Sequence, residues 1–129
     1  MMRYWLIPLD LYKKLNTEFN FDFDTCPNPV VFNSLKTNWG KMNYVNPPFR
    51  KKDSLSGLDG PTAFVKKAIK EQQKGKSSFL TLPTQSYVNL LLEAGAELRS
   101  LGRIKWLDVD SKKPMKSPGS ITGFYLRGI

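Results

Sequence analysis

The feature that most constrains this chain is a short apolar and aromatic run that stops at two consecutive prolines. The run begins at Met42 and leads into Asn46-Pro47-Pro48-Phe49. Proline has no N–H group to donate to a sheet, so two prolines end a strand and stiffen the turn that follows. The residue before a proline is also held extended. The pattern predicts a strand over about 42–46 that presents Asn46 at its carboxyl end, where open α/β sheets bind ligands.

This turn combines a carboxamide, backbone carbonyls that no helix can use, and an aromatic ring. Oxygens of Asn46 and Pro47 can accept hydrogen bonds from an exocyclic amine while Phe49 stacks on the base that carries it. Because both N–H bonds are then engaged, the lone pair of the nitrogen is left to attack an electrophile. An ordinary strand-ending turn is the alternative interpretation.

Apolar periodicity along the rest of the chain predicts strands alternating with helices. The expected helices cover 8–18, 61–74 and 85–94, and the expected strands cover 19–24, 42–46, 78–82 and 121–126, with a further strand element between Leu98 and Trp106. Thr84 is expected to cap the third helix and Leu92 to face inward. This order predicts an α/β sheet with helices on both faces, in a single domain over residues 1–129.

The charge of the chain is strongly positive and unevenly distributed. The net charge is +9, and residues 50–129 carry 15 basic and 7 acidic side chains, against 5 and 4 in residues 1–49. Such an excess favours a polyanionic partner. Residues 50–60, which are polar and rich in glycine, predict a mobile loop beside the site. Lysines 66, 67, 70 and 74 lie off the apolar stripe of their helix, which favours a solvated face over phosphate contact.

Composition also excludes several classes of chemistry. The chain has no histidine and one cysteine, which excludes Ser-His-Asp catalysis, histidine metal sites and an internal disulfide. No apolar run is long enough to span a bilayer, and we expect a cytoplasmic protein without a membrane partner. A metal-dependent nuclease built on Asp22, Asp24 and Asp53 is a minor alternative, because no further acidic cluster lies near them.

In their order and spacing, the motifs resemble the phage-type DNA N6-adenine methyltransferase family over most of the chain. The catalytic Asn-Pro-Pro-aromatic turn of that family is matched by Asn46-Pro47-Pro48-Phe49. The other matching elements are Trp5-Leu6-Ile7-Pro8, Glu18-Phe19-Asn20-Phe21 with Asp24, Leu35 with Trp39, Leu82-Pro83, and Gly102-Arg103 with Trp106. The chain departs from the family at Ile7, where a threonine is usual, and at Asn33, where an acid is usual.

The resemblance implies a reduced Rossmann-like methyltransferase sheet and an adenine-specific DNA methyltransferase, phage-encoded and so active in the host cytoplasm. Asn46, Pro47, Pro48 and Phe49 would be catalytic and would receive an adenine flipped out of double-stranded DNA. The cofactor would be S-adenosylmethionine, and the DNA backbone would be held by basic residues. The implied cofactor-binding residues are Trp5, Pro8, Asp24 and Asn33, and the implied DNA-binding residues are Arg50, Lys51, Lys52 and Arg103.

Three alternatives stay open within this resemblance. The chain could be a non-catalytic nucleic-acid-binding relative that has lost the cofactor. It could act on RNA, because the chemistry of the adenine amine is the same in both polymers. It could also modify cytosine N4, because the same turn can hold either amine.

Overall fold

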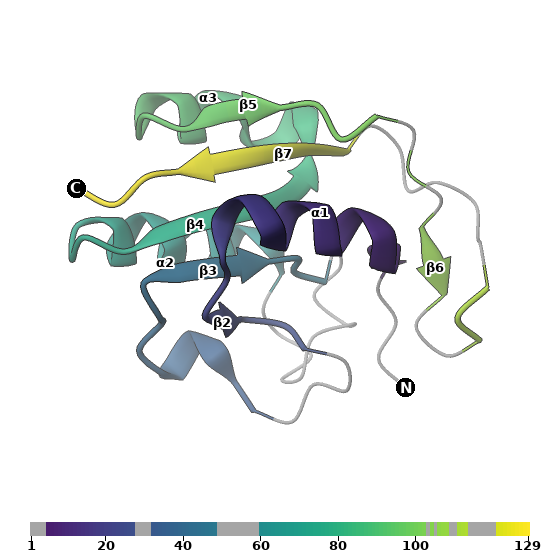
Figure 1. Cartoon of the computed structure of the whole chain (residues 1–129). Helices are drawn as coiled ribbons and strands as arrows, with labels where there is room; N and C mark the ends of the chain where they lie inside the picture. Colours follow the sequence, from purple (N-terminus) through teal and green to yellow (C-terminus); the bar gives the residue numbers. More distant parts are fainter. Residues whose placement is uncertain are drawn as a thin grey trace.

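The computed structural model describes residues 5–27, 32–48, 60–102, 104, 106–108, 111–113 and 121–129. For Trp5, Leu6 and Asp108 this description covers the backbone and not the side chain. This part of the chain forms an α/β fold around a five-stranded mixed sheet with the strand order β2-β3-β4-β7-β5 (Figure 1). Strands β2, β3 and β4 are parallel, and β7 is antiparallel to both β4 and β5. A separate pair, β1 and β6, lies beside the sheet.

The elements alternate along the chain as the periodicity predicts. The helices are α1 (Leu9–Phe19), the short 3-10 helix η1 (Ser34–Lys36), α2 (Pro61–Gln72) and α3 (Thr84–Glu93). The strands are β1 (Trp5–Leu6), β2 (Phe23–Asp24), β3 (Met42–Val45), β4 (Ser77–Pro83), β5 (Glu97–Arg99), β6 (Leu107–Asp108) and β7 (Ile121–Leu126). The prediction of an α/β sheet is confirmed.

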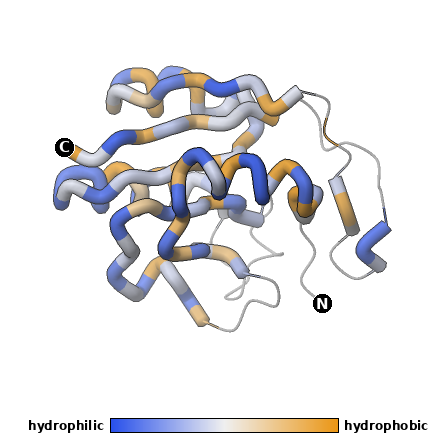
Figure 2. Tube along the Cα trace, viewed as in Figure 1, coloured by the Kyte–Doolittle hydropathy of each residue, from blue (hydrophilic) through white to orange (hydrophobic). Residues whose placement is uncertain are grey.

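Helices cover both faces of the sheet, as predicted. On one face the ring of Phe19 from α1 lies 5.0 Å from the rings of Phe79 in β4 and Tyr125 in β7. The other face packs against α2 and α3 in one apolar core, which includes Val65, Leu80, Leu91 and Phe124. Apolar and hydrophilic residues alternate along α1 (Figure 2), because one side of this helix meets the sheet and the other meets water.

Glycine 123 allows the α1 face to close over β7. A Cβ atom at this position would lie 2.5 Å from the Cζ atom of Phe79 on the neighbouring strand. The aromatic ring therefore occupies the space that any other side chain would need.

The predicted strand over 19–24 is too long. Asn20 adopts the left-handed conformation (φ 54°) and its N–H bonds the carbonyl of Asn16, which ends α1 only after Phe19. The Asn16 side chain then accepts from the N–H of Phe21 at 2.9 Å. Phe19 and Phe21 alternate because both rings fill the space beneath α1, and only Phe23 and Asp24 pair with the sheet.

Two expectations for the third helix are also wrong. Pro83 occupies the capping position of α3, and the hydroxyl of Thr84 pairs with the hydroxyl of Thr122 in β7. Leu92 is 46% exposed, whereas Leu91 is fully buried, because the narrow apolar stripe of α3 passes through position 91. Of the strand element expected between Leu98 and Trp106, the described residues contain only the overlap with β5, and β6, which pairs with β1, begins after it at Leu107.

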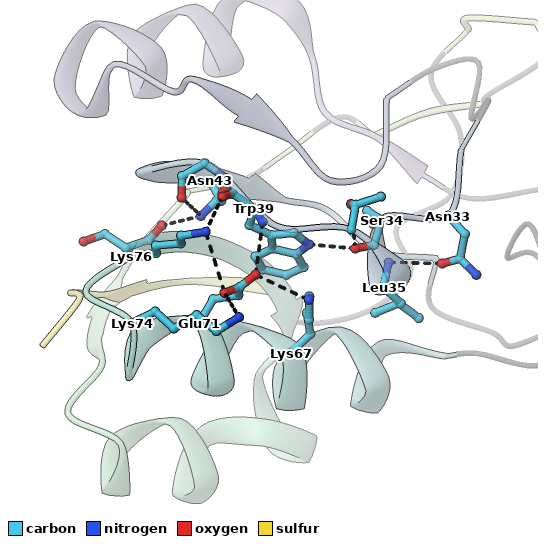
Figure 3. A network of polar contacts seen from close by, with 12 residues as sticks. Asn33, Ser34, Leu35, Trp39, Asn43, Lys67, Glu71, Lys74 and Lys76 are labelled. Atoms are coloured by element: carbon cyan, nitrogen blue, oxygen red, sulfur yellow. Dashed lines mark hydrogen bonds and ion pairs between the residues drawn. The ribbon is translucent and has the colours of Figure 1, made fainter.

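A buried carboxylate secures the connection between β2 and β3 (Figure 3). Glu71 of α2 accepts a hydrogen bond from the backbone N–H of Trp39 at 3.0 Å, and the Trp39 indole donates to the carbonyl of Ser34. Lys67, Lys74 and Lys76 place their ammonium groups 3.3, 3.3 and 3.9 Å from the same carboxylate. This network fixes η1 and the approach to β3 against α2.

The expected mobile loop over 50–60 lies outside the described residues except for Gly60. Among the described helices, none is both long and apolar enough to cross a membrane.

Candidate functional site at the carboxyl ends of β2 and β3

The structure brings Asp24 and Asn46 to the same edge of the sheet. Asp24 is the last residue of β2, and Asn46 follows directly after β3, its parallel neighbour. Asp24 is aligned with Tyr44, and Asn46 lies two residues beyond Tyr44. Side chains two residues apart in a strand point to one face, so all three lie on the face that α1 covers. The amino end of α1 lies at this edge too (Figure 1).

The carboxamide of Asn46 is buried and already has a partner. Asn46 is 3% exposed, and Pro47 and Pro48 are also buried. The Thr81 hydroxyl of β4 donates to Oδ1 of Asn46 at 2.8 Å. An amide oxygen has two lone pairs and can accept more than one hydrogen bond.

Asp24 is a half-buried acid that lacks a cationic partner within the described residues. Its Oδ1 atom accepts from the N–H of Cys26 at 3.0 Å, and no ion pair joins it to a described lysine or arginine. Burial raises the pKa of Asp24 above its ordinary value, and the hydrogen bond from Cys26 offsets only part of that effect. A desolvated carboxylate of this kind is held at a cost in stability, which favours a role in binding a donor or a cation.

Two phenols complete the polar group beneath α1. The rings of Tyr12 in α1 and Tyr44 in β3 meet edge to face at 5.0 Å. Burial, and then the charge of Asp24, raise the pKa of both phenols, so both are neutral hydroxyl groups at physiological pH. The Tyr44 hydroxyl is buried, and although the Thr81 hydroxyl is near enough to affect the Tyr44 pKa, no described group forms a well-aligned hydrogen bond with it.

Sequence reasoning missed Tyr12, Tyr44 and Thr81 as members of this site. The spacing of Tyr44 from Asn46 was available in the sequence, because residues two apart share a face of a strand. Thr81 carried no such signal, because its contact with Asn46 depends on how β3 and β4 align.

The remaining predicted cofactor residues lie at three places. Pro8 occupies the capping position of α1, where its carbonyl accepts from the N–H of Tyr12 at 3.0 Å. Asn33 caps η1, and its Oδ1 accepts from the N–H of Leu35 at 3.1 Å, which leaves its amide nitrogen to donate elsewhere. Trp5 pairs with Asp108 between β1 and β6, and its side chain lies outside the described part.

Five predicted site residues lie outside the described residues. They are Phe49, Arg50, Lys51, Lys52 and Arg103. The predicted stacking and DNA-backbone contacts therefore stay predictions.

Comparisons of this chain with protein-family models, curated proteins and solved structures find no match. The function is therefore argued from the sequence motifs and from the geometry of the chain itself.

Proposed function

We propose that this protein transfers a methyl group from S-adenosylmethionine to the N6 amine of adenine in DNA. The observation that carries the proposal is the placement of Asn46-Pro47-Pro48 and Asp24 at the carboxyl ends of two adjacent parallel strands. That edge is where open α/β sheets bind their ligands. The turn supplies acceptors for an amine, and the neighbouring strand supplies an acid.

The described residues fit S-adenosylmethionine in charge and in hydrogen bonding. The bound cofactor would supply a methyl group activated by a sulfonium cation. Asp24 has acceptor capacity and no described cationic partner, which suits ribose hydroxyls or a positively charged ligand. The Tyr44 hydroxyl is a buried donor without a described partner on the same face. Ile7 offers no hydroxyl where the resembling family has one.

The catalytic contribution of the chain would be positioning. Asn46 Oδ1 and the Pro47 carbonyl would accept the two N–H bonds of the amine, which orients its nitrogen lone pair. The Thr81 hydroxyl would hold the carboxamide through its 2.8 Å hydrogen bond to Oδ1. The raised pKa values of Tyr12 and Tyr44 keep both phenols protonated, so neither serves as a base.

The burial of Asn46 adds a requirement to this proposal. At 3% exposure, the carboxamide can meet a base only after the atoms that cover it move apart. Binding of DNA or cofactor must therefore open the site, as in enzymes whose loops move over the substrate. An unpaired adenine would be the easier substrate, because flipping a base out of a duplex costs a few kcal/mol.

The same burial favours a second candidate function. A non-catalytic nucleic-acid-binding protein would retain the turn as a structural element. Asn46 would then keep its hydrogen bond from Thr81 and would not bind the amine of a base. Such a protein would bind DNA and would give no heat with S-adenosylmethionine or its demethylated product in calorimetry.

A nuclease site at Asp22 gains no support from the geometry. Both carboxylate oxygens of Asp22 accept backbone N–H groups, from Lys41 at 3.1 Å and Met42 at 3.0 Å. Within the described residues, no three acids, cysteines or histidines are grouped closely enough to hold a metal ion.

The test of the proposed function is nucleoside analysis. The purified full chain is incubated with labelled S-adenosylmethionine and with unmethylated DNA or RNA, and the product is digested and separated. We expect label in N6-methyladenine from DNA, its loss in Asn46→Ala, and its retention in Asn38→Ala, which alters an exposed asparagine outside the site. Label in N4-methylcytosine or in RNA would change the substrate, and label in neither polymer would refute methyl transfer.

A further inference from the structure

Three exposed lysines form a row at helix α2. Lys66 and Lys70 lie four residues apart within α2, which places them on one side of the helix, and Lys74 lies in the turn that follows Gln72. At 1.5 Å per residue, Lys66 and Lys70 are about 6 Å apart along the helix axis. Phe64, Val65 and Ala68 are buried on the opposite side of α2, which fixes the row toward solvent.

Glu71, the acid of this helix, does not neutralise Lys66 or Lys70. Glu71 is fully buried, and its carboxylate faces Trp39 and the lysines at 67, 74 and 76 (Figure 3). Three ammonium groups share this single negative charge, so the network keeps a net positive charge. Lys66 and Lys70 form no ion pair with any described residue, and Lys36 on η1, which packs against α2, is also exposed.

The row runs from the carboxyl edge of the sheet toward its amino edge, on the face opposite α1. Helix α2 starts after β3 has ended at the carboxyl edge, and it returns to the amino end of β4 at Ser77. Lys66 is therefore nearer to the edge that holds Asn46, and Lys74 is farther from it. A polyanion bound at that edge can continue along α2.

We propose that the lysine row, Lys66 and Lys70 of α2 with Lys74 of the following turn, binds the phosphodiester backbone of the nucleic acid that occupies the candidate site. Phosphates follow one another every 3.4 Å along one strand of a duplex, so Lys66 and Lys70, about 6 Å apart along α2, match the spacing of about two phosphate steps. Backbone contacts position a nucleic acid without reading its sequence. This inference rests on the proposed function in taking nucleic acid as the partner.

The salt dependence of DNA binding tests the inference. The full-length Lys66→Gln/Lys70→Gln variant is compared with Lys41→Gln/Arg127→Gln, which removes two exposed cations at the amino edge of β3 and β4, opposite the edge that holds Asn46. Binding of a labelled duplex oligonucleotide is measured by fluorescence anisotropy from 50 to 300 mM salt. We expect the slope of log K against log salt to fall by about 1.8 for the α2 variant, because each lost phosphate contact removes about 0.9. The slope of the Lys41→Gln/Arg127→Gln variant should stay near the wild-type value.

The outcomes separate this inference from the proposed function. Equal slopes for both variants would show that overall charge, rather than the α2 row, governs binding, and would overturn the inference. If the Lys66→Gln/Lys70→Gln variant lost binding to vesicles containing phosphatidylglycerol and kept its binding to DNA, the row would be assigned to a membrane surface. That result would also overturn the inference. A protein that binds DNA through α2 but never methylates it would refute the proposed function and leave the inference supported. A hairpin RNA, measured in parallel, identifies which polymer supplies the phosphates.

Discussion

Replacement of Glu71 by glutamine tests the buried network most directly. The substitution keeps the size of the side chain and an oxygen that can accept from the Trp39 N–H, but it removes the charge that faces three lysines. Glu71→Leu removes the acceptor as well. The exposed acid Glu93 on α3 supplies the matched control, Glu93→Gln.

The expected loss of stability can be worked out contact by contact. A hydrogen bond to a charged acceptor is worth about 1 kcal/mol more than one to a neutral acceptor. Each ion pair to a lysine that is partly exposed contributes about 0.3–0.5 kcal/mol. Glu71→Gln should therefore cost about 2 kcal/mol. Glu71→Leu should cost about 1–3 kcal/mol more, because it leaves the buried N–H of Trp39 unpaired. The control should change stability by less than about 0.5 kcal/mol.

The pKa of Glu71 adds a pH dependence. Burial alone would raise this pKa, but the Trp39 N–H and the ammonium groups of Lys74 and Lys67 outweigh burial and hold it below 4.5. A lowered pKa in the folded state stabilises the protein above the unfolded value, and that stabilisation is lost as the pH falls through the folded value. The wild type should therefore lose its advantage over Glu71→Gln as the pH drops below about 4.5.

Urea denaturation followed by circular dichroism, at pH 7 and at intervals down to pH 3, provides the measurement. At pH 7 the glutamine variant should also melt about 8 °C lower, at roughly 4 °C per kcal/mol for a domain of this size. Equal stability of wild type and Glu71→Gln at pH 7 would refute the argument. A stability difference that does not depend on pH would show that the charge is not responsible.

Three further predictions concern the sheet and the candidate site. Gly123→Ala should destabilise the protein by about 1–3 kcal/mol, because the new methyl group clashes with Phe79. Adding Phe79→Leu to this variant should recover part of the loss in a double-mutant denaturation cycle. Additive effects of the two substitutions on the free energy of unfolding would contradict the clash. Cys26 is 8% exposed, and burial raises the pKa of its thiol to about 12. Ellman's reagent at pH 8 should therefore modify it slowly in the folded protein and at once in guanidinium, and a fast reaction of the folded protein would argue against the packing. Thr81→Val should lower the kcat of methyl transfer roughly tenfold or more with little change in KM. Thr81→Ser, which keeps the hydroxyl, should retain a kcat near the wild-type value. A valine variant with wild-type kcat would exclude the positioning role.

Local patterns in the sequence predicted most of the helices and strands, and they placed Asp24 and Asn46 at the ends of strands. Strand β7 matches its predicted bounds of 121–126. Helices α1, α2 and α3 begin within one residue of the prediction, because Pro8, Pro61 and Pro83 mark their first turns in the sequence. The strand predicted over 19–24 was wrong in its bounds, because alternating aromatic residues are compatible with a strand and also with a turn that packs under a helix. The roles expected of Phe49, Arg50, Lys51, Lys52 and Arg103 stay predictions.

The sequence by itself determined that two prolines end a strand at Asn46 and that an acid ends another at Asp24. Only the tertiary structure decided that these strands are parallel neighbours, that β7 lies between β4 and β5, and that Thr81 meets Asn46. The physical reason is that local periodicity records which face of a strand is buried, whereas strand order and register depend on hydrogen bonds between segments far apart in the chain.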